Sequence, residues 1–156
     1  ASGSATRAGH GRQVVTPTWT KIAQNGKNRA VSRRTATSRL VGGPAGAFPA
    51  LSEAGRYAFV SLQLPVDAHG RLLTGTAAAQ AALAVESLRL HLQVAGLRLD
   101  DVVKLSVYLA DGAVADEVDA ALAAAFHDPL PARTAVVVAG LPLGAALGIE
   151  AIAVRY

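Results

Sequence analysis

The order in which strand-like and helix-like segments follow one another constrains the fold of this chain most. Residues 76–95 carry an apolar stripe at helical spacing, and Thr76 and Gly96 are suited to cap the two ends of that helix. Residues 113–126 repeat apolar side chains every four positions, which predicts a second helix. This order predicts an α/β fold with both helices packed on one face of a mixed β-sheet. The segments expected to form its strands are 57–62, 103–109, 135–139 and 147–154.

Residues 131–142 contain the most specific clue to function. Arg133 comes just before a run of apolar, mostly β-branched residues, and Pro131 and Gly140 bound that run, which predicts a buried strand. The guanidinium stays protonated, so it needs an anion, carbonyl groups or water around it. It is suited to clamp a carboxylate with two parallel hydrogen bonds. A structural ion pair, or a strand end that faces solvent, explains it equally well on physical grounds.

The composition excludes several classes of function. The chain has 156 residues and no cysteine, which indicates one domain without disulfides, thiolate metal sites or cysteine nucleophiles. Phosphate-binding and metalloprotease motifs are missing, and no apolar run is long enough to span a membrane. Each histidine lacks a partner at metal-ligand spacing and is expected on the surface, so the histidines indicate no metal site. The four histidines are His10, His69, His91 and His127.

The charges are distributed unevenly. Residues 1–52 contain eight Lys or Arg and no Asp or Glu, whereas the remainder contains seven basic and eleven acidic residues. We therefore divide the chain into a basic N-terminal arm, 1–41, and a folded domain, 42–156. The arm resembles an organellar transit segment, suits contact with a macromolecular partner (protein or RNA), or is a disordered solubilising tail or a remnant of cloning. We expect a cytoplasmic protein, with an organellar location as the alternative.

A series of short motifs carries a resemblance to a known family. They occur in the order SLQLPVD at 61–67, AQ at 79–80, VAG at 94–96, LDDVVK at 99–104, VYL at 107–109, PART at 131–134, GLPLG at 140–144 and IEAIAV at 149–154. Together they resemble the RidA (YjgF-type, reactive intermediate deaminase) family over residues 43–156. The resemblance implies a chorismate-mutase-like α/β fold and a homotrimer with ligand clefts between subunits.

The same resemblance implies a reaction. Members of the RidA family hydrolyse 2-imino and 2-enamino acids, which pyridoxal-phosphate enzymes make, to 2-oxo acids and ammonia. The resemblance implies that no metal and no organic cofactor is needed. The arginine that matches Arg133 binds the substrate carboxylate. Backbone groups near Ser61, Leu62 and Ala135 are expected to shape the pocket.

Several positions depart from the family pattern. Phe48 stands where many members have a tyrosine, Leu62 replaces a glycine, and Ala135 replaces a cysteine. Gly148 replaces a glutamate that can hold the attacking water. Glu150 lies two positions further on the same strand face, so it is a candidate substitute for that carboxylate.

These departures leave two other functions open. The chain suits a catalytically impaired RidA-like trimer, recruited as a binding or structural subunit through its basic arm. Cleavage of RNA is ascribed to some members of the family, but the sequence offers no histidine pair or metal site for it.

Overall fold

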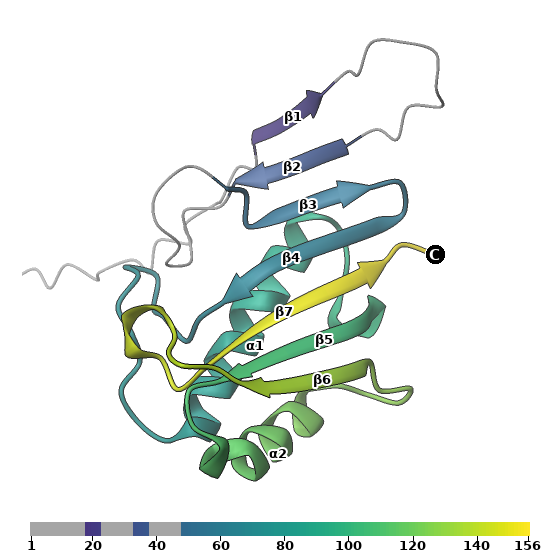
Figure 1. Cartoon of the computed structure of the whole chain (residues 1–156). Coiled ribbons are helices and arrows are strands. Elements are labelled where there is room, and N and C mark those ends of the chain that lie inside the picture. The colour runs from purple at the N-terminus through teal and green to yellow at the C-terminus, as the bar shows by residue number, and fades with distance from the viewer. Residues whose placement is uncertain (1–17, 23–32, 38–47) are drawn as a thin grey trace, which may run out of the picture.

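The computed structural model describes residues 18–22, 33–37 and 48–156 (Figure 1). Within these residues, seven strands form one sheet in the order β1-β2-β3-β4-β7-β5-β6, in which only β5 and β6 run parallel. The elements are β1 Thr18–Ile22, β2 Arg33–Thr37, β3 Leu51–Ala54, β4 Tyr57–Gln63, α1 Ala77–Val94, β5 Val102–Leu109, α2 Ala115–Ala125, β6 Ala132–Val137 and β7 Leu147–Val154, with short 3-10 turns at Leu99–Asp101, Gly112–Val114 and Pro142–Gly144.

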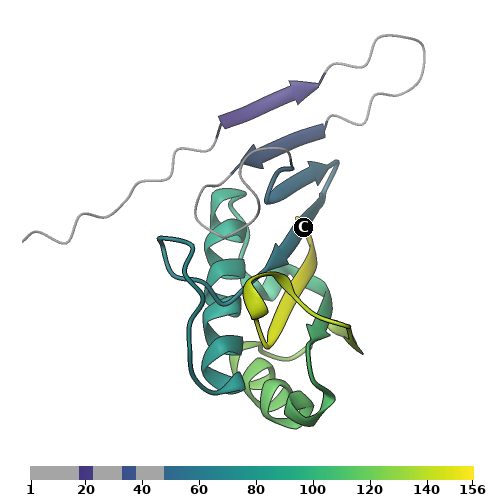
Figure 2. The same cartoon turned by 60° about the vertical axis from the view of Figure 1, so that its left-hand side comes forward.

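Both helices of the described part lie on the same side of the sheet (Figures 1 and 2). Helix α1 crosses β4 and β7, and α2 packs beside α1. The main core fills the space between the helices and the sheet, where Leu88, Leu92, Leu105 and Ile149 are almost fully buried. The predicted arrangement, an α/β fold with two helices on one face of a mixed sheet, is confirmed.

Helix α1 ends where its capping residues predict. The Thr76 side chain accepts a hydrogen bond from the backbone N–H of Ala79 at 3.2 Å, as an N-cap should. At the other end, Gly96 has φ +69°, and Leu97 N–H donates to the Leu92 carbonyl at 2.9 Å. This left-handed turn satisfies a carbonyl that the last helical turn leaves free.

The last part of the predicted strand pattern needs a correction. Strand β6 begins at Ala132 rather than at residue 135, and all six of its residues are exposed in the single chain, so the prediction of a buried strand is wrong there. The reason is its place at the edge of the sheet, where β5 is its one strand neighbour. Its apolar side chains, among them Val136 and Val137, are uncovered in a single copy.

The histidine prediction is wrong for one residue. His91 is 3 % exposed because it lies on the face of α1 that packs against the core. Its Nδ1–H donates to the Ser87 carbonyl at 2.8 Å, and its Nε2 is buried without a hydrogen-bond partner. Burial lowers the pKa of this imidazole. His69 and His127 are exposed, and His10 lies outside the described residues.

Three strands at the N-terminal side were not predicted. Strand β3 pairs with β4, and β2 and β1 extend the same antiparallel edge, with Thr35 opposite Ser52. Both β1 and β2 fall within the segment that the sequence assigned to the basic arm. The predicted boundary between residues 41 and 42 lies outside the described residues, so it stays a prediction.

In the part of the chain that the structure describes, none of the helices has the length and apolar character that crossing a membrane requires.

Candidate active site

A β-bulge in β4 brings two of the predicted site residues together. Val60 pairs with Ala151 and Gln63 pairs with Ile149, so Ser61 and Leu62 lie opposite a single residue of β7. Such a bulge bends its strand and changes where the extra side chain points, and bulges are common beside active sites. The side chain of Gln63, 1 % exposed, holds this bend because its Nε2 donates to the Ser61 carbonyl at 2.7 Å.

Leu62 and Gly148 are in close contact. A Cβ atom added at Gly148 would lie 2.7 Å from Leu62 Cδ1, which is far inside ordinary contact distance, and 3.3 Å from Leu64 Cδ2, which is slightly inside it. The Leu62 side chain therefore occupies the space that any side chain at position 148 would need. The two departures from the family pattern, at 62 and at 148, belong to one contact.

Glu150 has a partner that the sequence did not reveal. The Tyr108 hydroxyl donates to Glu150 Oε2 at 2.9 Å across the paired strands β5 and β7. This hydrogen bond to a carboxylate, with a smaller contribution from burial, raises the pKa of the Tyr108 phenol. In residues 103–109, Lys104, Ser106 and Tyr108 alternate with apolar residues, which puts Tyr108 on the polar face of the strand, but its cross-strand partner depends on the register of the sheet.

Ser61 and Glu150 line a cavity on the face of the sheet that the helices leave open. The cavity has a volume of about 400 Å³. Phe48 is one of the residues that line it, and 88 % of its surface is exposed. The Lys104 ammonium is hydrogen-bonded to the Thr134 hydroxyl beside it. The lining consists of Phe48, Pro49, Ser52, Phe59, Val60, Ser61, Lys104, Ser106, Glu150, Ala151 and Ile152.

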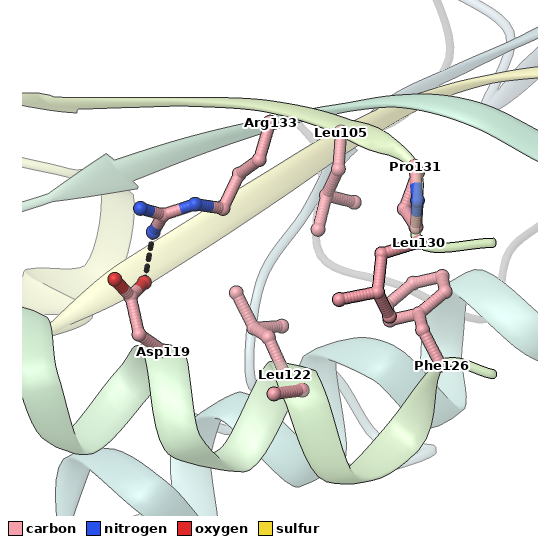
Figure 3. A pocket seen from close by; sticks show the side chains of 8 residues that line it. Leu105, Asp119, Leu122, Phe126, Leu130, Pro131 and Arg133 are labelled. Carbon is pink, nitrogen blue, oxygen red and sulfur yellow. Dashed lines mark hydrogen bonds and ion pairs between the residues drawn. The ribbon is translucent and has the colours of Figure 1, made fainter. Parts of the chain in front are cut away.

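Arg133 lies at a second cavity, on the helix side of β6 (Figure 3). It stands beside Leu105 in the parallel register with β5, and its Nη1 is hydrogen-bonded and ion-paired to Asp119 Oδ1 of α2. The structural ion pair considered for this arginine is therefore present. Because a guanidinium has five N–H donors, the pair leaves most of them for a ligand.

The second cavity has a volume of about 230 Å³ and an apolar wall. Figure 3 shows Leu122, Phe126 and Leu130 facing the same space as the Arg133 side chain. The full lining is Leu105, Asp119, Leu122, Ala123, Phe126, Leu130, Pro131 and Arg133.

A single copy does not unite the predicted site residues. Ala135 is paired with the core residue Val107, and Arg133 with Leu105, so both lie toward the helix side of β6. Phe48, Ser61 and Glu150 line the other cavity, which shares no residue with that of Arg133. Within the described residues, no group of three or more His, Asp or Glu side chains is placed to hold a metal ion.

Comparisons with known proteins give this geometry a context. A family model described as "Endoribonuclease L-PSP" matches residues 41–155. The 2-iminobutanoate/2-iminopropanoate deaminase of Rattus norvegicus is 40% identical over 101 residues, which cover 64% of this chain and 74% of the relative. "Protein MMF1, mitochondrial" of Saccharomyces cerevisiae is 32% identical over 128 residues, covering 81% and 88%. The crystal structure of RidA from an Antarctic Psychrobacter has a TM-score of 0.72 at 31% identity, covering 78% of this chain and 98% of that one.

Proposed function

Because the chain belongs to the endoribonuclease L-PSP family, the family of the RidA and YjgF proteins, we propose that it hydrolyses 2-imino and 2-enamino acids to 2-oxo acids and ammonia. Membership confirms the resemblance drawn from the sequence motifs, and the solved relatives confirm the chorismate-mutase-like fold class. The reaction itself is supported by relatives that are named deaminases, of rat and of Salmonella typhimurium.

The observation that carries the proposal is Arg133 at the mouth of an apolar cavity. Its free N–H groups suit the carboxylate of a 2-imino acid, and binding there would hold the reacting carbon in place. Water then adds to the C=NH₂⁺ carbon, a proton moves to the nitrogen, and the C–N bond breaks. The products are the C=O of the 2-oxo acid and ammonium.

Glu150 is our candidate for the group that orients this water. Position 148 cannot carry a carboxylate while Leu62 fills the space above it, whereas Glu150 is held by Tyr108 at the open cavity. Phe48 supplies an apolar wall there, and Ser61 offers backbone groups from the bulge, with Leu62 next to it in the strand. A positioned carboxylate of this kind contributes about 10²–10⁴-fold to proton transfer.

We also propose that the site is completed between copies of the chain in a homotrimer. The Arg133 cavity and the Glu150 cavity are separate in one copy, and the edge strand β6 exposes 43% of Val136 and 60% of Val137. Exposed apolar side chains in a row on a strand favour a protein partner. A neighbour packed on this region would cover them and bring a second set of site residues toward Arg133.

The first experiment measures 2-oxo acid release from freshly generated 2-aminoacrylate or a 2-imino acid. Arg133→Ala should reduce the rate about 10²-fold or more, because the substrate loses its positioning contact. Arg133→Lys is the matched control: it keeps the charge but loses the planar fork, so intermediate activity is expected. Circular dichroism checks that each variant is folded. Turnover in Arg133→Ala equal to that of the unaltered protein would reject the clamp.

A second candidate function is favoured by the contact between Leu62 and Gly148. In this proposal the chain is a catalytically impaired trimer that acts as a binding or structural subunit, with the basic arm 1–41 holding a protein or RNA partner. It predicts that neither the unaltered protein nor a Leu62→Gly, Gly148→Glu double variant differs from Arg133→Ala in the assay. Activity in the unaltered protein that is lost in Arg133→Ala would exclude it.

The place of the protein in the cell is also a proposal. We expect the cytoplasm, and the alternative is an organelle, which the basic arm 1–41 and the relative named mitochondrial both favour. A fluorescent fusion at the C-terminal end of the chain, with and without residues 1–41, separates the two.

A further inference from the structure

We propose that Asp119 is a specificity-determining residue of the Arg133 clamp. By neutralising the guanidinium, it restricts the cavity to monocarboxylates with an uncharged, apolar side chain and disfavours a ligand with a second carboxylate. The inference rests on the proposed binding of a carboxylate by Arg133. The relevant features are the ion pair, the charge balance of the cavity and its apolar lining.

The ion pair places an anion where the ligand would bind. Asp119 on α2 points toward β6 and bonds to Nη1 of Arg133 (Figure 3). The two side chains are 38% and 39% exposed, so a ligand can reach them from solvent. Since only Nη1 is engaged by Asp119, a ligand carboxylate would bind to other N–H groups of the same guanidinium. The ligand carboxylate would then lie close to the Asp119 carboxylate.

The charge balance of the cavity makes the number of ligand charges matter. Among its lining residues, Arg133 and Asp119 are the charged ones, so their formal charges cancel. A first ligand carboxylate gains a direct hydrogen-bonded contact with the arginine. A second one finds no free cation in the lining and is repelled by Asp119, and like charges brought together weaken binding strongly.

The lining determines what the rest of the ligand must be. Leu105, Leu122, Phe126 and Leu130 form the wall beside the ion pair. Burying a charge against such a wall without a partner is costly, whereas an aliphatic side chain gains from contact with it. The volume of about 230 Å³ suits a small ligand, since it is below the roughly 300–1,000 Å³ usual for larger ones.

The test measures binding of two stable 2-oxo acids by titration calorimetry. One is 4-methyl-2-oxopentanoate, with one carboxylate and an aliphatic side chain, and the other is 2-oxopentanedioate, with two carboxylates. The unaltered protein should bind the first at least about tenfold more tightly. Asp119→Asn keeps the shape and removes the charge, so it should tighten both and reduce the preference about fivefold or more.

A matched control is available in α1. Glu86→Gln removes the same charge from another exposed carboxylate–arginine pair, Glu86 with Arg89, and should leave both affinities unchanged. An unchanged preference in Asp119→Asn would overturn the inference. Weaker binding of the monocarboxylate by Asp119→Asn would also overturn it, because Asp119 would then only position Arg133. A lack of binding by the unaltered protein and by every variant would overturn it as well.

The design separates this inference from the proposed function. Arg133→Ala should lose binding of both compounds, which needs no turnover to be seen. If binding depends on Arg133 and Asp119 as described but no imine is hydrolysed, the deaminase proposal fails and the inference stands. If Arg133→Ala binds as well as the unaltered protein, the clamp and the inference fail together.

Discussion

At the scale of single residues, Leu62 and Gly148 act as one unit, because the leucine side chain fills the space beside the glycine Cα. In this chain the space between β4 and β7 at this point is therefore filled by an apolar side chain.

This contact predicts how substitutions at position 148 behave. Gly148→Ala should lower the free energy of unfolding by about 1–3 kcal/mol, because the new methyl group overpacks against Leu62. The same change made together with Leu62→Ala should cost much less than the sum of the two single changes, since they share one space. Urea unfolding of the four proteins measures this coupling. Additive costs would show that the two positions are independent.

The sequence predicted most of the candidate residues but not their grouping. Of the residues that the motifs singled out, Arg133, Ser61 and Glu150 line cavities, and Leu62 lies beside Gly148. Motif spacing could not reveal that Tyr108 bonds to Glu150, because that depends on the register between two strands that are distant in sequence. Asp119 was missed for the same reason. An acidic residue in a helix usually faces solvent, and the sequence does not show that Arg133 is its neighbour.

At the scale of elements, α1 contains a buried titratable group that makes its packing sensitive to pH. His91 lies in the core-facing stripe of the helix, and burial lowers its pKa below the usual value of 6.5. In the unfolded chain the imidazole takes up a proton as the pH falls through 6.5, while the folded chain does not. Stability is therefore full above pH 6.5 and is lost as the pH falls toward the lower, folded pKa.

The expected loss is up to roughly 1.4 kcal/mol per pH unit in that window. Replacement by a neutral, apolar residue, His91→Leu, should flatten the dependence between pH 7 and 5, although the variant loses the hydrogen bond to Ser87. His69→Gln, an exposed histidine, is the control and should keep the slope of the unaltered protein. Thermal unfolding at a series of pH values provides the comparison. Equal slopes in all three proteins would contradict this account.

Elements with strong local signals were predicted well, and those that depend on neighbours were not. Helix α1 has caps that act within a few residues, so its ends were predicted to within one residue. Strand β3 has four residues, which is too short for an alternating pattern to stand out. Strand β6 has the composition of a buried strand, but its exposure depends on its place at the sheet edge, which a single sequence does not contain.

At the scale of the whole molecule, the described part of the chain has two helices on one face of the sheet, and the other face carries exposed aromatic side chains. Tyr57 and Phe59 of β4 are 48% and 44% exposed there, with their ring centres 6.4 Å apart. In the proposed homotrimer this face is expected to contact the other copies. Sedimentation of the unaltered protein should then give the mass of three copies. Phe59→Lys should shift it toward smaller species, because a charge would be buried in the contact.

Leu90→Lys is the control for this measurement. Leu90 is 37% exposed on α1, on the helix side of the sheet, so a lysine there should leave the assembly intact. A single copy in solution for the unaltered protein would contradict the proposed trimer. Equal effects of the two lysines would place the contact elsewhere.

The place of β7 in the sheet has a consequence for how the protein is made. It is the last strand in the sequence, yet it lies between β4 and β5 and is hydrogen-bonded to both. While a ribosome is still translating residues 147–154, β4 and β5 have no strand between them, and the α1 side of the core lacks Ile149. The sheet can close only after this segment leaves the exit tunnel, so until then a nascent chain exposes two unpaired strand edges, which promote association with other chains.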